Sequence, residues 1–380
     1  MVNFGREVSR RAFMMTAGAI VVGCASSRQQ GKSSMSKTNT YKDERTGAVL
    51  RRLVSGQGNN QVVYQTHPMW GLQMRHLLFV SDRTVGKPLP HVLEVSSGQI
   101  WCATPTGADD WTLSRKDNTL YFRRGSTLFS KDISSRDCEE NLVAELSDWA
   151  GLHPISMSLD ADEKSLYTGV VVEPDRRWGI VYLDLLAPKL EVFVEVDFKV
   201  GHVQANPVRP GLVMFCHETG GDAPQRMWVV NRNGSGLKPF YKETYDEWVT
   251  HEVWWGADRA IFTVWPYDEV HRNLPHGVVS ADLETGTPKV HGQFPAWHTH
   301  GSPDGRWAVA DDFDGNLWLI CIQDGERRLL SQGHRKPGFD THLHPSFTPD
   351  SKAVVFNSSY WGSNDILLVE LPDWQTLPAA

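Results

Sequence analysis

Short apolar runs separated by turn residues recur along most of the chain. Four of them are Leu77-Leu78-Phe79, Leu120-Tyr121-Phe122, Ala260-Ile261-Phe262 and Val354-Val355-Phe356. Such runs are too short for helices, and Gly, Pro and Asp stand between them. Runs of this length with β-branched and aromatic residues predict strands. The pattern therefore predicts an all-β protein.

The strands belong to a longer repeat of seven copies. Each copy opens on a histidine or a tryptophan, which a turn and an apolar run then follow. The opening residues are His67, Trp111, His153, His202, His251, His298 and His344, at intervals of 44, 42, 49, 49, 47 and 46 residues. A period of roughly 40 to 50 residues with several short strands is typical of a β-propeller blade. We therefore expect one domain, a seven-bladed β-propeller over residues 41–380.

The two ends of the repeat region predict how the ring closes. The sixth copy holds four strands, at 298–303, 306–311, 316–322 and 327–331. The last copy holds only three, the third at 366–371, and an orphan strand at 48–53 precedes the first copy. We expect this N-terminal strand to complete the last blade, which leaves the ring without an open edge.

The first 40 residues lie outside the repeat and are typical of an export signal. Residues 1–24 contain the twin-arginine motif Ser9-Arg10-Arg11, an apolar run and a lipobox-like sequence that ends at Cys24. Residues 25–40, rich in Ser, Gln and Lys, predict a flexible tether. We expect an exported, periplasmic protein that is anchored to the membrane as a lipoprotein through Cys24. A retained membrane anchor is the alternative.

Composition and motifs exclude several classes of function. The 380 residues carry a net charge of −7, with an isoelectric point near 6.1. This charge argues against nucleic acid as a partner and limits membrane contact to the lipid anchor or signal. The chain has no Gly-x-Ser-x-Gly elbow and no phosphate-binding loop. The other four cysteines, which lack Cys-x-x-Cys spacing, are expected to be buried thiols (Cys102, Cys138, Cys216 and Cys321).

Histidines at the repeat starts are the residues most suited to chemistry. In a propeller the innermost strands begin at one mouth of the central channel, so these histidines are expected to gather there. His342 and His344 are two residues apart and share a face if the segment is a strand, as two metal ligands do. The alternative is a pair of hydrogen-bonded turn histidines. We expect His67 and His153 to be structural.

Loops between the second and third strands of each blade reach the same mouth. Several of them carry arginines, and Arg226 stands beside His217-Glu218 at the start of a strand. Arginine binds carboxylates through two parallel hydrogen bonds, and aromatic faces stack on sugars. A mouth of this composition suits an acidic carbohydrate.

Four motifs resemble those of the oligogalacturonate lyases of polysaccharide lyase family 22. These motifs lie at residues 215–218, 226–228, 250–252 and 341–350, and the similarity extends from about residue 41 to residue 371. The resemblance implies a seven-bladed propeller that cleaves uronate-containing oligosaccharides by β-elimination, giving a 4,5-unsaturated uronate. It implies an acidic oligosaccharide as substrate and a divalent metal ion, by default Mn²⁺.

The resemblance also assigns roles to single residues. His251 matches the catalytic base and Arg226 the catalytic arginine. The matching metal ligands are His298, His342 and His344. His202, His217 and Glu218 lie in matching motifs and are expected near the substrate.

One metal ligand of the family is replaced. The position of its glutamine is Phe339 here, which cannot bind a metal. Asp340, His300 or Asp312 is then a candidate for the fourth ligand, and His300 also competes with His298. Because imidazole also suits zinc or iron, Zn²⁺ and Fe²⁺ remain open beside Mn²⁺.

Other functions remain open at this point. A non-catalytic propeller of the TolB type would bind sugar or a periplasmic partner, and it would have no need of the histidine cluster. A lyase acting on ulvan-type uronates, and a hydrolase or epimerase with the same metal site, are the further alternatives.

Overall fold

The computed structural model describes residues 34–35, 39–146, 155–172, 177–219, 223–244, 247–266 and 276–380. They lie in the compact unit Ser33–Ala380. The predicted export signal and most of the predicted tether lie outside the described residues and remain predictions. In the part of the chain that is described, no helix is long and apolar enough to span a membrane.

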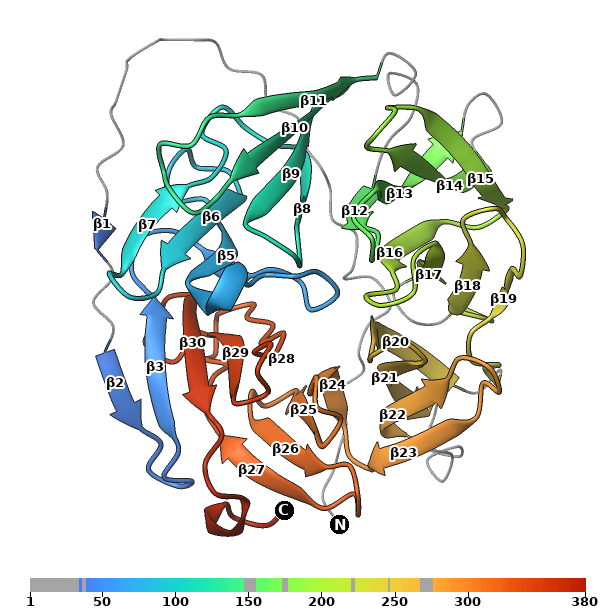
Figure 1. Ribbon diagram of the computed structural model, residues 1–380. Helices are drawn as coiled ribbons and strands as arrows, with labels where there is room; N and C mark the ends of the chain where they lie inside the picture. Colours follow the sequence, from blue (N-terminus) through green and yellow to red (C-terminus); the bar gives the residue numbers. More distant parts are fainter. Residues whose placement is uncertain are drawn as a thin grey trace. The chain divides into compact units, whose positions relative to one another are not determined.

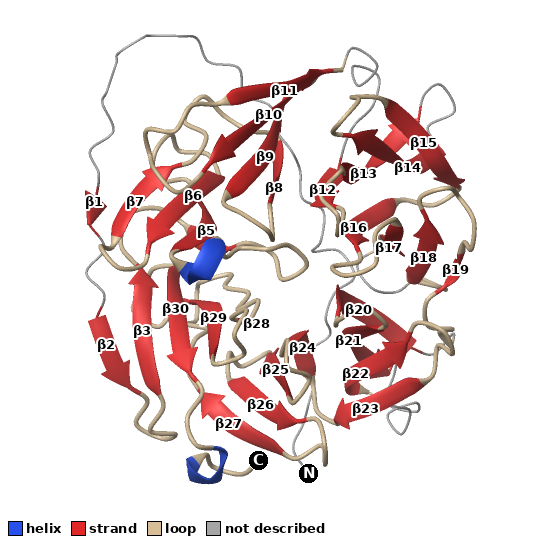
Figure 2. Ribbon diagram, viewed as in Figure 1, coloured by secondary structure: helices blue, strands red, loops and turns tan. Residues whose placement is uncertain are grey.

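Seven antiparallel sheets are arranged in a ring, with one strand of each sheet innermost, at the centre of the ring (Figure 1). Among the described residues, strands and loops make up nearly all of the structure (Figure 2), apart from two 3₁₀ turns, Leu72–Met74 and Trp374–Thr376. The predicted seven-bladed, all-β propeller is confirmed.

The first three blades contain strands β4 to β15. Blade 1 consists of β4 (Asn60–Val62), β5 (His76–Ser81), β6 (Leu89–Glu94) and β7 (Gln99–Cys102), with β1 (Ser34–Met35) on its outer edge. Blade 2 consists of β8 (Asp110–Leu113), β9 (Thr119–Arg124), β10 (Thr127–Asp132) and β11 (Asn141–Glu145). Blade 3 consists of β12 (Ile155–Leu159), β13 (Ser165–Val172), β14 (Arg177–Asp184) and β15 (Leu190–Val196).

Blades 4 to 6 contain strands β16 to β27. Blade 4 consists of β16 (Val200–Ala205), β17 (Leu212–His217), β18 (Met227–Asn231) and β19 (Lys238–Pro239). Blade 5 consists of β20 (Glu247–Trp254), β21 (Arg259–Pro266), β22 (Gly277–Asp282) and β23 (Pro288–Gly292). Blade 6 consists of β24 (Ala296–Gly301), β25 (Trp307–Asp312), β26 (Leu317–Cys321) and β27 (Arg327–Ser331), within two residues of the predicted strands.

Blade 7 joins the two ends of the propeller unit. Its strands β28 (Ser346–Phe347), β29 (Ala353–Ser358) and β30 (Asp365–Glu370) come from the C-terminal end, and β3 (Val49–Val54) and β2 (Asn39–Lys42) from the N-terminal end. Strand β3 pairs with β30 along Leu50–Val54. The predicted closure is confirmed, with β2 as a further strand that begins inside the predicted tether.

The apolar cores lie between neighbouring blades. One core joins Leu77 of blade 1, Leu113 of blade 2 and Val355 of blade 7. A strand in the middle of a blade is covered on both faces, and all six residues of β29 are buried. This two-sided burial explains why these strands are continuous apolar runs in the sequence instead of alternating patterns. The four described cysteines are free, but only Cys216 is buried, so the prediction of buried thiols is wrong for the other three.

Closure of the ring through β3 predicts that substitutions at two adjacent residues of this strand lower the stability of the protein by very different amounts. The side chain of Leu50 is fully buried between blades 6 and 7, whereas Val49 is 45% exposed. Leu50→Ala is expected to lower the free energy of unfolding by about 2–5 kcal/mol. Val49→Ala, the matched control, is expected to change it by about 0.5 kcal/mol. Denaturant unfolding measures both, and equal effects would contradict closure by this strand.

Candidate active site

A one-residue bulge recurs at one register of the innermost strands. In β20 the pairing moves from Thr250 with Thr263 to Val253 with Ile261, so the inner strand has one residue more than its neighbour. Strands β12, β16 and β24 of blades 3, 4 and 6 carry the same bulge. A bulge redirects side chains that would otherwise follow the alternation of the strand.

The bulges hold histidines in an uncommon backbone conformation. The φ angle of His202 is +44° and that of His251 is +58°, and His344 has a φ angle of +44° just before β28. Outside glycine, this left-handed region costs about 1–3 kcal/mol and persists only where surrounding contacts impose it.

Two glutamine side chains from other blades support the bulged segments. The Nε2 atom of Gln204 donates to the carbonyl oxygen of Glu252 at 2.9 Å. The Nε2 atom of Gln65 donates to the carbonyl oxygen of Thr299 at 2.8 Å. Each of these hydrogen bonds satisfies a backbone carbonyl group in or beside a bulge.

Three predicted metal ligands meet at the channel. One nitrogen of each of His298, His342 and His344 lies within 4.8 Å of the others. The ring centre of His298 is 4.4 Å from that of His344 and 5.4 Å from that of His342. Burial lowers the pKa of all three imidazoles below the usual value, so they are neutral near pH 7 and can act as metal ligands.

The pair His342 and His344 does not lie in a strand, which corrects the sequence interpretation. Both precede β28 in a loop. Asn357 of β29 fixes this loop, because its side chain donates to the carbonyl oxygen of His342 at 2.9 Å and its backbone N–H donates to that of Leu343 at 2.8 Å. The two rings converge through the loop and the positive φ angle of His344.

A buried carboxylate orients His298. The Oδ2 atom of Asp311 lies 2.9 Å from Nδ1 of His298, and its Oδ1 atom accepts the backbone N–H of His298 at 2.6 Å. This leaves Nε2 of His298 as the atom that could bind a metal ion, as in the common carboxylate–histidine–metal arrangement. Burial raises the pKa of Asp311 to about 8. A cation on His298 favours the ionised carboxylate, so cation and carboxylate stabilise each other.

The candidates for the missing ligand lie in different surroundings. His300 is turned away from the cluster, and its Nδ1 atom accepts the backbone N–H of Phe347 at 3.4 Å. Both carboxylate oxygens of Asp312 are hydrogen-bonded within its own turn and to Trp318. Asp340, which is exposed, has its Oδ1 atom 3.5 Å from Nε2 of His342. Of these three candidates, Asp340 is the one beside the cluster.

His251 lies next to the metal histidines. Its ring centre is 4.3 Å from that of His298. Burial, with His298 and the positively charged Arg226 nearby, holds the pKa of His251 well below its usual value, so the imidazole is neutral at pH 7. The Oγ1 atom of Thr263 lies 3.3 Å from Nδ1 of His251 and donates its own hydrogen to a backbone carbonyl. Nδ1 must then carry a hydrogen, which leaves the lone pair on Nε2.

Arg226 belongs to a buried ion-pair network. Its Nε atom lies 2.8 Å from Oε2 of Glu252, and both side chains are almost fully buried. Burial raises the pKa of a carboxyl group, but Arg226 and His202 hold the pKa of Glu252 well below its usual range. Nδ1 of His202 is 2.9 Å from Oε1 of Glu252, and Oε2 of Glu218 lies 3.6 Å from Arg226. The Nη1 group of Arg226 has no hydrogen-bond partner among the described residues.

The remaining predicted histidines have different surroundings. The ring of His217 stacks on Phe198 in blade 4, with ring centres 4.4 Å apart. Nε2 of His67 lies 2.9 Å from the carbonyl oxygen of Met157, in the structural role predicted for it. His153 lies outside the described residues.

Sequence reasoning missed several residues of the site. Glu252 stands in a motif of the resemblance but received no role, and Asp311 and Thr263 carry no local signal. The ring of Tyr64 contacts both His202 and His344, with ring centres 5.2 Å and 4.9 Å away. Trp297 contacts His298 and His342.

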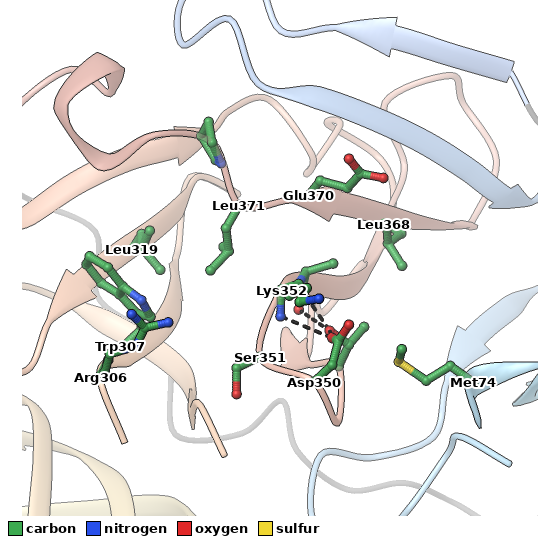
Figure 3. Close-up of a pocket in the computed structure, with 13 residues that line it drawn as sticks. Met74, Arg306, Trp307, Leu319, Asp350, Ser351, Lys352, Leu368, Glu370 and Leu371 are labelled. Atoms are coloured by element: carbon green, nitrogen blue, oxygen red, sulfur yellow. Dashed lines mark hydrogen bonds between the residues drawn. The ribbon is translucent and has the colours of Figure 1, made fainter. Parts of the chain in front are cut away.

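A separate cavity of about 600 Å³ lies at the far end of β28 (Figure 3). Its lining includes Arg306, Asp350, Lys352 and Glu370 and contains no histidine. The carboxylate of Asp350 is used in the turn, since it accepts the backbone N–H of Lys352 and the hydroxyl of Thr348. The residues suited to catalysis therefore lie at the histidine cluster and not in this cavity.

Comparisons with known proteins point to one group of enzymes. The chain is 25% identical over 270 residues to an oligogalacturonide lyase of Pectobacterium atrosepticum, a match that covers 63% of this chain and 66% of the relative, just under two thirds. It is 24% identical over 310 residues to an oligogalacturonate lyase of Dickeya dadantii, covering 69% of this chain and 78% of the relative. No protein-family model matches.

Two solved structures share the whole fold. An oligogalacturonate lyase in complex with manganese superposes with a TM-score of 0.79 at 23% identity, covering 90% of this chain and 98% of the other. An oligogalacturonate lyase from Vibrio parahaemolyticus superposes with a TM-score of 0.77 at 20% identity, covering 91% and 99%. The chain is related to the oligogalacturonate lyases. The resemblance stated from its motifs is confirmed, and these lyases share its seven-bladed architecture.

The geometry of the cluster predicts which substitutions affect metal binding. His298→Ala is expected to abolish binding of one metal equivalent, and Asp311→Asn to weaken it about 10- to 100-fold through loss of the orienting carboxylate. His300→Ala is expected to leave the affinity unchanged, because this ring lies outside the cluster. Calorimetric titration with Mn²⁺ and Zn²⁺ checks all three. Unchanged binding by His298→Ala would contradict the site.

Proposed function

We propose that this protein is a metal-dependent lyase that cleaves oligogalacturonate or a similar uronate oligosaccharide by β-elimination. The observation that carries the proposal is a neutral histidine, His251, packed 4.3 Å from the centre of one ring of a three-histidine cluster. Kinship with the oligogalacturonate lyases supports the same reaction class.

His251 is proposed as the general base. Elimination begins with removal of the C5 proton of a uronate, which needs a neutral base within reach of the sugar ring. The low pKa of His251 keeps it neutral, and Thr263 leaves the lone pair on Nε2. After the proton moves to Nε2, the electrons of the C5–H bond form the C4–C5 double bond and the C4–O bond breaks. The departing O4 oxygen takes the electron pair of that bond and is protonated by water to give a hydroxyl group.

Arg226 is proposed to stabilise the negative charge that develops on the substrate during the reaction. Its Nε and Nη2 groups are held by Glu252, while Nη1 has no protein partner among the described residues. A buried guanidinium in this orientation can donate to the substrate carboxylate or to the departing O4 oxygen. Charge-assisted hydrogen bonds are strongest in a site that excludes water.

His298, His342 and His344 are proposed to hold a divalent cation. When bound, such a cation withdraws electron density from the substrate carboxylate, which makes the C5 proton more acidic. Three neutral imidazole nitrogens fit a first-row divalent metal. The manganese complex of one structural neighbour supports a divalent ion, and Asp340 is the candidate for a further ligand.

The proposed activity accounts for the site better than a binding scaffold does. Burying several neutral histidines and the Arg226–Glu252 pair costs desolvation energy that a simple scaffold has no reason to spend. The proposed substrate class remains a uronate, with an ulvan-type sugar as an untested variant. Export and lipid anchoring remain predictions from residues 1–24.

The first prediction from the proposed function concerns the general base. Metal-loaded protein is expected to produce an unsaturated uronate from oligogalacturonate, detected by ultraviolet absorbance. His251→Ala is expected to lower kcat by about 10²- to 10⁴-fold, because a general base contributes that factor. A variant with full activity would contradict the assignment, provided that its metal content is equal to that of the parent protein.

The second prediction concerns the orientation of the base. Thr263→Val keeps the size of the side chain but removes the hydroxyl group near Nδ1 of His251. We expect kcat to fall about threefold to tenfold with little change in KM, as for the loss of one hydrogen bond. Thr263→Ser is expected to restore kcat. A Val variant that affects only thermal stability would assign Thr263 a structural role alone.

A further inference from the structure

Aromatic rings and one arginine lie beside the metal histidines and have no part in the proposed mechanism. The ring centre of Trp297 is 4.7 Å from that of His298 and 4.3 Å from that of His342. Phe313 stacks on Trp297 at 5.0 Å with an interplanar angle of 23°. The guanidinium of Arg335 lies over Trp297 at 4.9 Å. Trp297 therefore connects the metal histidines to both Phe313 and Arg335.

Phe313 lies in a hydrogen-bonded turn between β25 and β26. Oδ1 of Asp312 accepts the backbone N–H groups of Asp314 and Asn316, each at 3.0 Å. Its Oδ2 atom accepts the side-chain N–H groups of Asn316 and Trp318. The turn holds Phe313 at the mouth, and this side chain remains 43% exposed. An exposed phenyl ring backed by a stacked indole is a preformed apolar platform.

Arg335 is fixed by the same turn. Its Nη1 group donates to the carbonyl oxygen of Phe313 at 3.0 Å. Gly315 has a φ angle of +79°, and a Cβ atom there would lie 2.4 Å from Cβ of Arg335. Glycine at this position therefore permits the close approach that brings the guanidinium to Trp297.

Among the residues that the structure describes, Arg335 has no carboxylate partner. In the described segments, no Asp or Glu oxygen lies within 4.0 Å of its guanidinium nitrogens. Arg52, which also lies over an aromatic ring, is by contrast paired with Asp365 at 2.7 Å. Of the five N–H donors of Arg335, one binds the Phe313 carbonyl, so a planar pair of donors remains for an anion.

We propose that Phe313 and Arg335 form a second uronate subsite, next to the unit whose C5 proton is removed. The face of the neighbouring sugar ring packs on Phe313, and its carboxylate binds the guanidinium of Arg335 through two hydrogen bonds. This inference rests on the proposed function and specifies its substrate as an oligosaccharide with acidic groups on at least two adjacent sugars.

The subsite has a specificity that the metal centre alone lacks. The substrate of the proposed lyase carries a carboxylate on every uronate, and the metal histidines with Arg226 account for one of them. The guanidinium group of arginine binds a carboxylate more tightly than its methyl ester. The ester has no charge and does not offer two equivalent oxygens for parallel hydrogen bonds. Free-acid oligosaccharides are therefore bound in preference to esterified ones at this position.

Binding without turnover tests the subsite directly. Digalacturonate and its two monomethyl esters are titrated calorimetrically into metal-loaded His251→Ala protein, alone and combined with Arg335→Gln, Arg335→Lys or Phe313→Ala. Arg335→Gln is expected to weaken digalacturonate binding about 10- to 100-fold. One of the two monoesters is then expected to bind this variant as tightly as the diacid does. Phe313→Ala is expected to weaken binding about threefold to tenfold.

A matched control separates local from general charge effects. Arg306 lies on the far cavity, with its side chain 73% exposed and paired with Asp304 at 2.7 Å. Arg306→Ala is expected to leave binding unchanged. Arg335→Lys, which keeps the charge but loses the fork, is expected to show an intermediate loss and serves if the glutamine variant does not fold.

The outcomes distinguish the subsite from the proposed reaction. Equal affinities in the parent and both Arg335 variants, with an unchanged preference for the diacid over each ester, would overturn the subsite. Binding that depends on Arg335, in a protein whose parent form yields no unsaturated product, would support the subsite and overturn the lyase assignment.

Discussion

The candidate site depends on a departure from regular strand geometry that is repeated around the channel. The innermost strands of blades 3 to 6 each contain a bulge with one extra residue at the same register. In β16 and β20 the first residue of the bulge is a histidine with a positive φ angle. A regular strand would have directed alternate side chains into the spaces between blades. The bulge instead aims His202 and His251 at the channel, where His298 and His344 meet them.

Two kinds of buried polar group lie side by side in this channel. The histidines are neutral because burial and neighbouring positive groups lower their pKa values. Arg226 and Glu252 are charged because each compensates the other at 2.8 Å. A neutral base and a fixed cation in one water-poor site are the two requirements for removing a proton next to a carboxylate. The fold supplies both through adjacent blades.

Much of the architecture could be predicted from the sequence because each blade repeats a physical pattern. The period gave the blade count, and the orphan strand before the first copy gave the closure by β3. The convergence of His298, His342 and His344 followed from the resemblance, whereas the expectation that the last two lie in a strand was wrong, since the loop is shaped by Asn357. Partners such as Thr263 and Asp311 are 12 and 13 residues from His251 and His298 and lie on the neighbouring strand. Arg335 reaches the metal histidines through Trp297. Only packing between strands and blades brings them together, so no local pattern reveals them.

The proposed cleavage of the substrate at this mouth is an elimination and not a hydrolysis. The most direct test is to run the reaction of metal-loaded protein on oligogalacturonate in water labelled with heavy oxygen and to weigh the products by mass spectrometry. Elimination predicts products whose masses sum to that of the substrate and that carry no label, after correction for exchange at the reducing end. Products that gain one labelled water across the cleaved bond would contradict the account.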